Sequence, residues 1–392
     1  MYSQEKILSL LASGLEAAGH NHTVSSLGDR QSYLGMSDLA AGLTCPRAVV
    51  ARKLQGEPAS QPLETLLQLR RGHWLEYGVE EALAAAGQKY ISQLEISVEY
   101  KGVPVKAHLD FVLFDEAANA VTVIELKSVG RIREHVYGSH EAQLYGQLGL
   151  LRTFWNSRCF RITGSQFGKK LTEHVDSDYC TLSEMAKRQV GVQLPDDADS
   201  VSIRGFVLTI SPKEARAFGP YEPNQELLSV ILDAGKGLWQ SLAEIKSGQG
   251  ILDDVATQHG FSPLCDFCTH NRSCPKFQGG DHPALEPELS ALAELKRQRS
   301  RLEEEIKERE EQLKAIAALM GTPGQWINGE HHRFKVSRTA GRATLDQSLL
   351  KANLCHLKQV DENQLDTIIA TAQKISRPFE RLQLSPISGV QP

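Results

Sequence analysis

The sequence has no long uncharged apolar run. Its apolar stretches, such as residues 39–43 and 82–87, are far shorter than the roughly 20 residues that a membrane-spanning helix needs. The first twenty residues carry Glu5, Lys6 and Glu16 in place of the apolar core of a secretion signal. We therefore expect a soluble cytoplasmic protein that does not enter a membrane.

An excess of positive charge is also lacking. The 43 Lys and Arg residues are outnumbered by 48 Asp and Glu residues, which gives a net charge of −5. Contact with a nucleic acid would therefore depend on local basic patches. No G-x-x-x-x-G-K-[ST] segment occurs, which excludes a built-in ATP motor, and no H-E-x-x-H segment supports a zinc hydrolase.

The remaining composition is that of an ordinary globular protein, with 392 residues of which 41% are hydrophobic and 23% charged. This length suggests two to three domains, or one large domain with additions. Apolar residues at helical spacing predict helices over 3–18, 63–86, 138–153 and 225–247. Strands are predicted over 91–100, 103–114, 121–127 and 202–210, and near Phe160.

The C-terminal third has a different pattern. From Leu295 to Met320, eight positions follow a strict 4-3 spacing, and all but Arg299 and Arg309 are Leu, Ile or Met. This spacing predicts a long helix or coiled coil over 283–321, through which two copies of the chain could associate. Residues 331–336 alternate as a strand does and belong to a small C-terminal module over 322–392. The first domain is expected to cover 1–282.

The hairpin between 103 and 127 carries the strongest chemical signal. If its turn centres between Ala117 and Ala118, Asp110 lies directly opposite Glu125. The two-residue period of a strand then places Lys127 on the same face as Glu125. One patch would hold two carboxylates and one amine.

Such a patch can bind a metal ion. Two carboxylates within about 5 Å of each other are costly unless a divalent cation lies between them, and oxygen ligands suit Mg²⁺ or Mn²⁺. The lysine could orient or deprotonate an attacking water, or offset charge that develops on phosphorus. The intervening Ile124 and Leu126 are expected to point into apolar packing. The alternative is a solvated strand face without function.

The segment from Asp110 to the triplet 125–127 resembles the core of the PD-(D/E)xK nuclease superfamily. This resemblance implies an α/β fold with a restriction-endonuclease-like αβββαβ core and helical flanks, followed here by the long helix and a small α+β module. His73 is similar to the metal-ligand histidine of the RecB-like branch, and Glu76 is the alternative ligand. The resemblance thus implies a metal set of His73, Asp110 and Glu125.

A second flanking motif also resembles the RecB-like branch. Gln143 is similar to the glutamine that the family carries on the helix after the three strands, which adds it to the catalytic set of Asp110, Glu125 and Lys127. The family usually has a tyrosine four residues later. Here that position is Gln147, and the tyrosine is Tyr145.

The cysteines suggest a second metal centre. A C-x2-C-x5-C pattern is formed by Cys265, Cys268 and Cys274. Cys45 is similar to the lone N-terminal cysteine of iron-sulfur RecB-like nucleases, including CRISPR-associated and AddB-type members, and the resemblance implies a [4Fe-4S] cluster on these four residues. The alternative is a zinc site with His270 or His259 as the fourth ligand. The other three cysteines are expected to be small core residues.

Basic residues follow the predicted catalytic strand and could contact phosphates. They are Arg131, Arg133, Arg152, Arg158, Arg161, Lys169 and Lys170. The alternative is a generic basic surface.

The resemblance implies a metal-dependent DNA nuclease. We expect an exonuclease that acts on single-stranded DNA or DNA ends in recombination, repair or phage replication, with a helicase or recombination protein as a partner. The alternative is a nuclease-fold DNA-binding or adaptor protein without cleavage activity.

Overall fold

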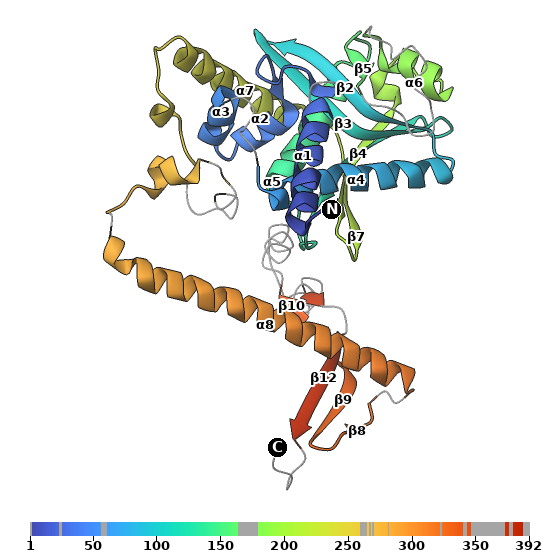
Figure 1. Cartoon of the computed structure of the whole chain (residues 1–392). Coiled ribbons are helices and arrows are strands. Elements are labelled where there is room, and N and C mark those ends of the chain that lie inside the picture. Colours follow the sequence, from blue (N-terminus) through green and yellow to red (C-terminus); the bar gives the residue numbers. More distant parts are fainter. Residues whose placement is uncertain are drawn as a thin grey trace, which may run out of the picture. The chain divides into compact units, whose positions relative to one another are not determined.

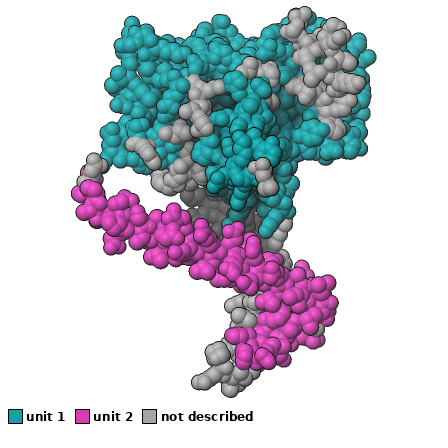
Figure 2. All heavy atoms as spheres, in the orientation of Figure 1, with its two compact units in different colours: residues 1–279 teal, residues 280–392 magenta. Residues whose placement is uncertain are grey.

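The computed structural model describes residues 2–22, 26–55, 61–163, 179–258, 265, 268, 270–280, 282–321, 324–339, 343–345, 373–375 and 379–386. The chain divides into two compact units, Met1–Gly279 and Gly280–Pro392 (Figure 2). The three-part division expected from the sequence stays a prediction. No helix among the described residues is long and apolar enough to cross a membrane.

The first unit is built on one open mixed sheet with the strand order β5-β2-β3-β4-β6-β7, and β1 pairs with β3 (Figure 1). Its strands are β1 (Leu34–Gly35), β2 (Tyr90–Tyr100), β3 (Val103–Asp115), β4 (Ala120–Ser128), β5 (Phe160–Ile162), β6 (Ser202–Ile210) and β7 (Ala215–Tyr221). Along this order the first three pairs are antiparallel, β4 and β6 run parallel, and β7 returns antiparallel to β6, while β1 runs parallel to β3. The sequence did not predict β7.

Helices cover this sheet. They are α1 (Gln4–His22), α2 (Met36–Gly42), α3 (Pro46–Gln55), α4 (Leu63–Ala85), α5 (Gly138–Thr153), α6 (Leu182–Val190) and α7 (Gln225–Lys246). The succession α4-β2-β3-β4-α5-β5 has the predicted αβββαβ order, so the predicted α/β fold class is confirmed. The sequence analysis missed α6, although Thr181 and Glu184 form a capping box at its start, which is a readable signal.

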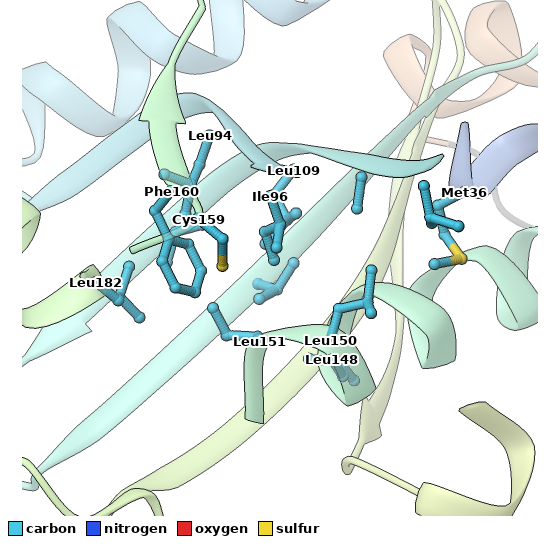
Figure 3. Packing of buried hydrophobic residues seen from close by; sticks show 14 of the residues in the cluster. Met36, Leu94, Ile96, Leu109, Leu148, Leu150, Leu151, Cys159, Phe160 and Leu182 are labelled. Atoms are coloured by element: carbon cyan, nitrogen blue, oxygen red, sulfur yellow. The ribbon is translucent and has the colours of Figure 1, made fainter. Parts of the chain in front are cut away.

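The core lies between the sheet and α5. Figure 3 shows Leu94, Ile96 and Leu109 from β2 and β3 facing Leu148 and Leu151 of α5, and all five side chains are fully buried. Burying side chains of this size contributes about 1.5–3 kcal/mol each before conformational entropy is subtracted. The expectation of core cysteines holds for Cys159 and Cys180, whereas Cys355 lies outside the described residues.

The β3–β4 hairpin has the predicted register. Its ladder runs from Asp115 opposite Ala120 to Phe111 opposite Ile124, which agrees with a turn centred between residues 117 and 118. The expected burial behind the patch is wrong, since Ile124 and Leu126 stay partly exposed whereas Val121, Val123 and Glu125 are buried. The more buried face of β4 is therefore the one that carries Glu125.

The regular pairing of β3 changes at Asp110. Toward β4 the ladder ends one residue later, at Phe111. Toward β2, the ladder omits Gln93, which lies between Ser92 and Leu94 and has a left-handed φ of 52°. Burial along β3 alternates regularly up to Phe111 and then shifts by one position, because the next residue, Val112, is buried as well. Asp110 therefore lies where the sheet departs from regular geometry.

The second unit contains α8 (Glu286–Leu319) and five short strands. The strands are β8 (Ile327–Asn328), β9 (His332–Thr339), β10 (Ala343–Leu345), β11 (Gln373–Ile375) and β12 (Phe379–Pro386). The predicted long helix is confirmed and begins earlier than Leu295, with 34 residues that span roughly 51 Å. Leu295, Leu302 and Ile306 on its predicted seam are each more than half exposed. The predicted strand near 331–336 is confirmed by β9, which pairs with β8 and β12.

Candidate active site

The end of the β3–β4 ladder brings four predicted residues together. On β4, the Nζ of Lys127 lies 2.6 Å from the Oε1 of Glu125 and 3.1 Å from the Oε1 of Gln143 on α5. The Nε2 of Gln143 donates to the Oε1 of Glu125 at 2.8 Å. On β3, the Oδ2 of Asp110 accepts the backbone N–H of Leu126 at 2.7 Å, in place of the next ladder bond.

The electrostatics of this cluster are unusual. Burial raises the pKa of Asp110 well above its ordinary value, and the charges of Glu125 and Glu76 raise it further, against the opposing charge of Lys127. Burial alone would lower the pKa of Lys127, but Glu125 and Asp110 more than offset this and raise it. The amine is therefore held as an ammonium ion near neutral pH, and acidic charge collects around Asp110.

Two residues that the sequence analysis did not include complete the cluster. Gln147 is fully buried, and its Nε2 donates to the Oε2 of Glu125 at 2.6 Å and to the backbone oxygen of His108 at 2.9 Å. His140 lies near Lys127, since burial and then the charge of Lys127 lower the pKa of His140 to about 4. The signal for both was their helical spacing of three and four residues from Gln143.

Tyr145 does not take the place of the family's tyrosine. Its ring packs edge-on against Tyr221 of β7, with the ring centroids 5.4 Å apart. Gln147 stands four residues after Gln143, where the resemblance would place a tyrosine, and it is the residue that contacts Glu125.

The helix α4 contributes a further carboxylate. Glu76 lies close enough to Asp110 to raise the pKa of that residue, and it accepts a hydrogen bond from Gln93, the residue with the left-handed φ. The Nδ1 of His73 lies 3.6 Å from the Oε2 of Glu76, and the His73 side chain is 41% exposed. Of the two alternative ligands on α4, Glu76 is therefore the one whose charge reaches Asp110.

The donor chemistry of the cluster fits a hard divalent cation. Asp110, Glu125 and Glu76 supply carboxylate oxygens, and a cation would offset the negative charge that raises the pKa of Asp110. Within the part of the chain that the structure describes, no three His, Cys, Asp or Glu side chains converge closely enough to hold a metal ion. Both oxygens of Glu125 are instead engaged by Lys127, Gln143 and Gln147.

The four predicted cluster cysteines are free and partly buried. Cys45 directly precedes α3, and this helix is tied to the chain ahead of the other three cysteines, because the backbone N–H of Arg47 bonds to Ala256 and its guanidinium lies 2.7 Å from Asp253. Gln55, at the other end of α3, lies 3.4 Å from the ring of His270. The fold therefore links α3 both to the chain ahead of the cysteine segment and to His270 within it.

Hydrogen bonds between residues close in sequence fix the backbone of the cysteine segment. The backbone N–H of Cys268 donates to Cys265 at 3.1 Å, and the Asn271 side chain donates to the oxygen of Cys265 at 2.8 Å. The Nζ of Lys276 lies 3.7 Å from the Sγ of Cys265. His259, one of the two alternative zinc ligands, lies outside the described residues.

Three of the predicted phosphate contacts are engaged by carboxylates. Arg161 binds Glu95 through two bonds of 2.6 and 3.0 Å, Arg158 binds Glu184 through two bonds of 3.1 Å, and Arg152 pairs with Asp199. Arg131 and Arg133 are exposed in the segment between β4 and α5, and the guanidinium of Arg133 lies 4.6 Å from the ring of Tyr137. Lys169 and Lys170 lie outside the described residues.

Comparisons with known proteins give no family. No protein-family model and no curated protein sequence matches the chain. Among solved structures, the chain is similar to "Crystal structure of SSO0001", with a TM-score of 0.39 and 15% identity over 71% of this chain and 100% of that one. It is also similar to a "Putative exonuclease" from Eubacterium rectale, with a TM-score of 0.31 and 12% identity over 67% of this chain and 95% of that one. At these TM-scores, neither similarity bears on fold or activity.

Proposed function

We propose that the protein is a metal-dependent DNA nuclease. The observation that carries this proposal is the convergence of Asp110, Glu125, Lys127 and Gln143 where the β3–β4 ladder ends. The proposed reaction is hydrolysis of phosphodiester bonds by an exonuclease that acts on single-stranded DNA or DNA ends, in recombination, repair or phage replication. A helicase or recombination protein is the proposed partner, because the sequence carries no ATP motor.

Each residue of the site has a different role in the proposed reaction. Mg²⁺ or Mn²⁺ bound by Asp110 and Glu125, with Glu76 or His73, would supply Lewis acidity and an activated water. The Lys127 ammonium would offset the negative charge that develops on the phosphate oxygens. Gln143 and Gln147 are positioning residues, because each donates a hydrogen bond to Glu125 and fixes one of its oxygens.

A metal-dependent digestion tests this proposal. Single-stranded and double-stranded DNA labelled at either end is incubated with the full chain in Mg²⁺, in Mn²⁺ and in EDTA. We expect cleavage only with a divalent cation, with the labelled products reporting polarity and strand preference. DNA binding without cleavage in either cation would contradict the nuclease and support the alternative, a binding or adaptor protein.

We further propose that Cys45, Cys265, Cys268 and Cys274 hold a [4Fe-4S] cluster with a structural role. The support is the four-thiol donor set, the ties between α3 and the cysteine segment, and Lys276 beside Cys265. Anaerobically purified protein should be brown, and Cys45→Ser should lose iron and thermal stability together. One zinc and no iron would reject the cluster in favour of the zinc site with His270 or His259.

A further inference from the structure

The second unit carries a partly exposed tryptophan beside two cations. Trp326, just before β8, is 38% exposed. The guanidinium carbon of Arg333 lies 5.1 Å from the centre of its ring, and the Nζ of Lys335 lies 5.0 Å from it. Both distances are within the range of cation–π contacts.

Strand pairing explains this arrangement. In the β8–β9 ladder, Ile327 lies opposite Phe334 and Asn328 opposite Arg333, so the same antiparallel register brings Trp326 beside Lys335. Arg333 and Lys335 are two residues apart on β9 and therefore project from the same side of the strand. The sheet thus presents one aromatic ring and two cations together.

The surrounding segment is basic and lacks acidic residues. From residue 331 to residue 345 the sequence has no Asp or Glu, although the whole chain has a net charge of −5. On the neighbouring strand β12, Ser385 is opposite Arg333 and Gln383 is opposite Lys335, and neither carries a charge. Among the described residues, no carboxylate forms an ion pair with Arg333 or Lys335, in contrast to Arg152, Arg158 and Arg161 of the first unit.

This combination suits a single nucleic-acid strand. Proteins bind such strands by stacking aromatic rings on bases and by placing cations beside the phosphates. A duplex hides the faces of its bases, whereas a single strand exposes them. We propose that Trp326, Arg333 and Lys335 form a binding site for single-stranded DNA, in which a base stacks on Trp326 and the flanking phosphates contact the two cations. This site goes beyond the proposed hydrolysis and does not depend on it.

Fluorescence measurements on the full chain test the site. A labelled 15-residue oligothymidylate is titrated in EDTA, which prevents metal-dependent cleavage. Trp326→Ala is expected to weaken binding by about 5- to 160-fold, since a stacked base contributes about 1–3 kcal/mol. Trp326→Phe should keep most of the affinity and lose the binding-induced quenching of tryptophan fluorescence, which holds even if Trp326→Ala does not fold.

The salt dependence of DNA affinity distinguishes specific contacts at this site from attraction by basic residues elsewhere on the surface. Arg333→Gln with Lys335→Gln should lower the slope of log affinity against log salt concentration by about 1.4, from about 0.7 for each phosphate contact on a single strand. The matched control is Lys296→Gln with Arg297→Gln on α8, which removes the same charge and should leave the slope unchanged. Equal slopes for the two pairs, equal competition by duplex DNA, or identical quenching in wild type and Trp326→Phe would each overturn the proposal.

Discussion

Two carboxylates on neighbouring strands have opposite surroundings. Glu95 on β2 is fully buried and accepts bonds from Arg161, from Lys106 at 3.3 Å and from the hydroxyl of Tyr179 at 2.9 Å. Burial acts to raise the pKa of Glu95, but Arg161, His108 and Lys106 more than offset it and lower the pKa. Asp110 on β3 is surrounded by protein and by other acids, and its pKa is raised.

The difference separates a carboxylate that is neutralised within the fold from one that is not. Cationic side chains within the fold neutralise the charge of Glu95, so this carboxylate needs no bound ion as a counter-charge. Asp110 has one opposing ammonium and two acidic neighbours, so its ionised form is electrostatically unfavourable in the folded protein. Groups with strongly perturbed pKa values of this kind collect at functional sites.

The largest expected effect is on cleavage. Glu125→Gln and Lys127→Met should each lower the cleavage rate by at least about 10³-fold, because both groups act on the reacting phosphate or its water. DNA binding should stay within a few fold, since affinity comes mainly from phosphate contacts spread elsewhere. The exposed Glu222→Gln and Lys213→Met are the matched controls, and cleavage that persists in both site variants would place the active site elsewhere.

The next effect is on stability at Glu95. Glu95→Gln should lower the free energy of unfolding by about 3 kcal/mol, because it leaves Arg161 and Lys106 without a buried counter-charge. Urea unfolding measures the change. Glu184→Gln is the control: its carboxylate pairs with Arg158 at the surface, glutamine also suits the capping box of α6, and the loss of stability should be much smaller than at Glu95. Equal losses of unfolding free energy for Glu95→Gln and Glu184→Gln would contradict the expectation that the buried ion pair matters more than the exposed one.

Asp110 should respond in the opposite direction. Asp110→Asn keeps an oxygen that can accept the Leu126 N–H and removes one of the gathered negative charges. In EDTA at neutral pH we expect the free energy of unfolding to rise by about 1 kcal/mol. In Mg²⁺ we expect the same variant to have lost cleavage. A loss of stability instead would show that the Asp110 charge is satisfied within the fold, as that of Glu95 is.

The smallest expected effect is a difference in how the stability changes of Glu95→Gln and Asp110→Asn depend on pH. The lowered pKa of Glu95 contributes stability above the unfolded pKa of about 4.3, and this is lost as pH falls through the folded pKa. The raised pKa of Asp110 has the reverse consequence, since its contribution is present below the unfolded pKa and is lost as pH rises through the folded value. The destabilisation by Glu95→Gln should therefore shrink in acid, and the stabilisation by Asp110→Asn should disappear there. Urea titrations from pH 3 to pH 8 measure both differences, and parallel curves for the two variants would contradict the contrast.

Much of the proposed site could be predicted from local sequence. The register that sets Asp110 against Glu125 depends only on the hairpin turn and the period of a strand, and the observed pairing of Phe111 with Ile124 agrees with it. Gln143 was expected only because its motif resembles that of the RecB-like nucleases. The C-terminal helix was predictable because its apolar residues repeat at a fixed interval within a single element.

Contacts between distant segments were decided by the tertiary structure. Nothing near Arg161 in the sequence shows that Glu95, 66 residues earlier, takes up its charge, and the same holds for Glu76 beside Asp110. The left-handed Gln93 and the shift in the burial pattern of β3 arise where β2, β3 and β4 meet, not from any one strand. Periodic patterns determine which faces of helices and strands are apolar, because that information is local. Which charges neutralise one another, and which are left for a ligand, depends on packing between segments that only the folded chain brings together.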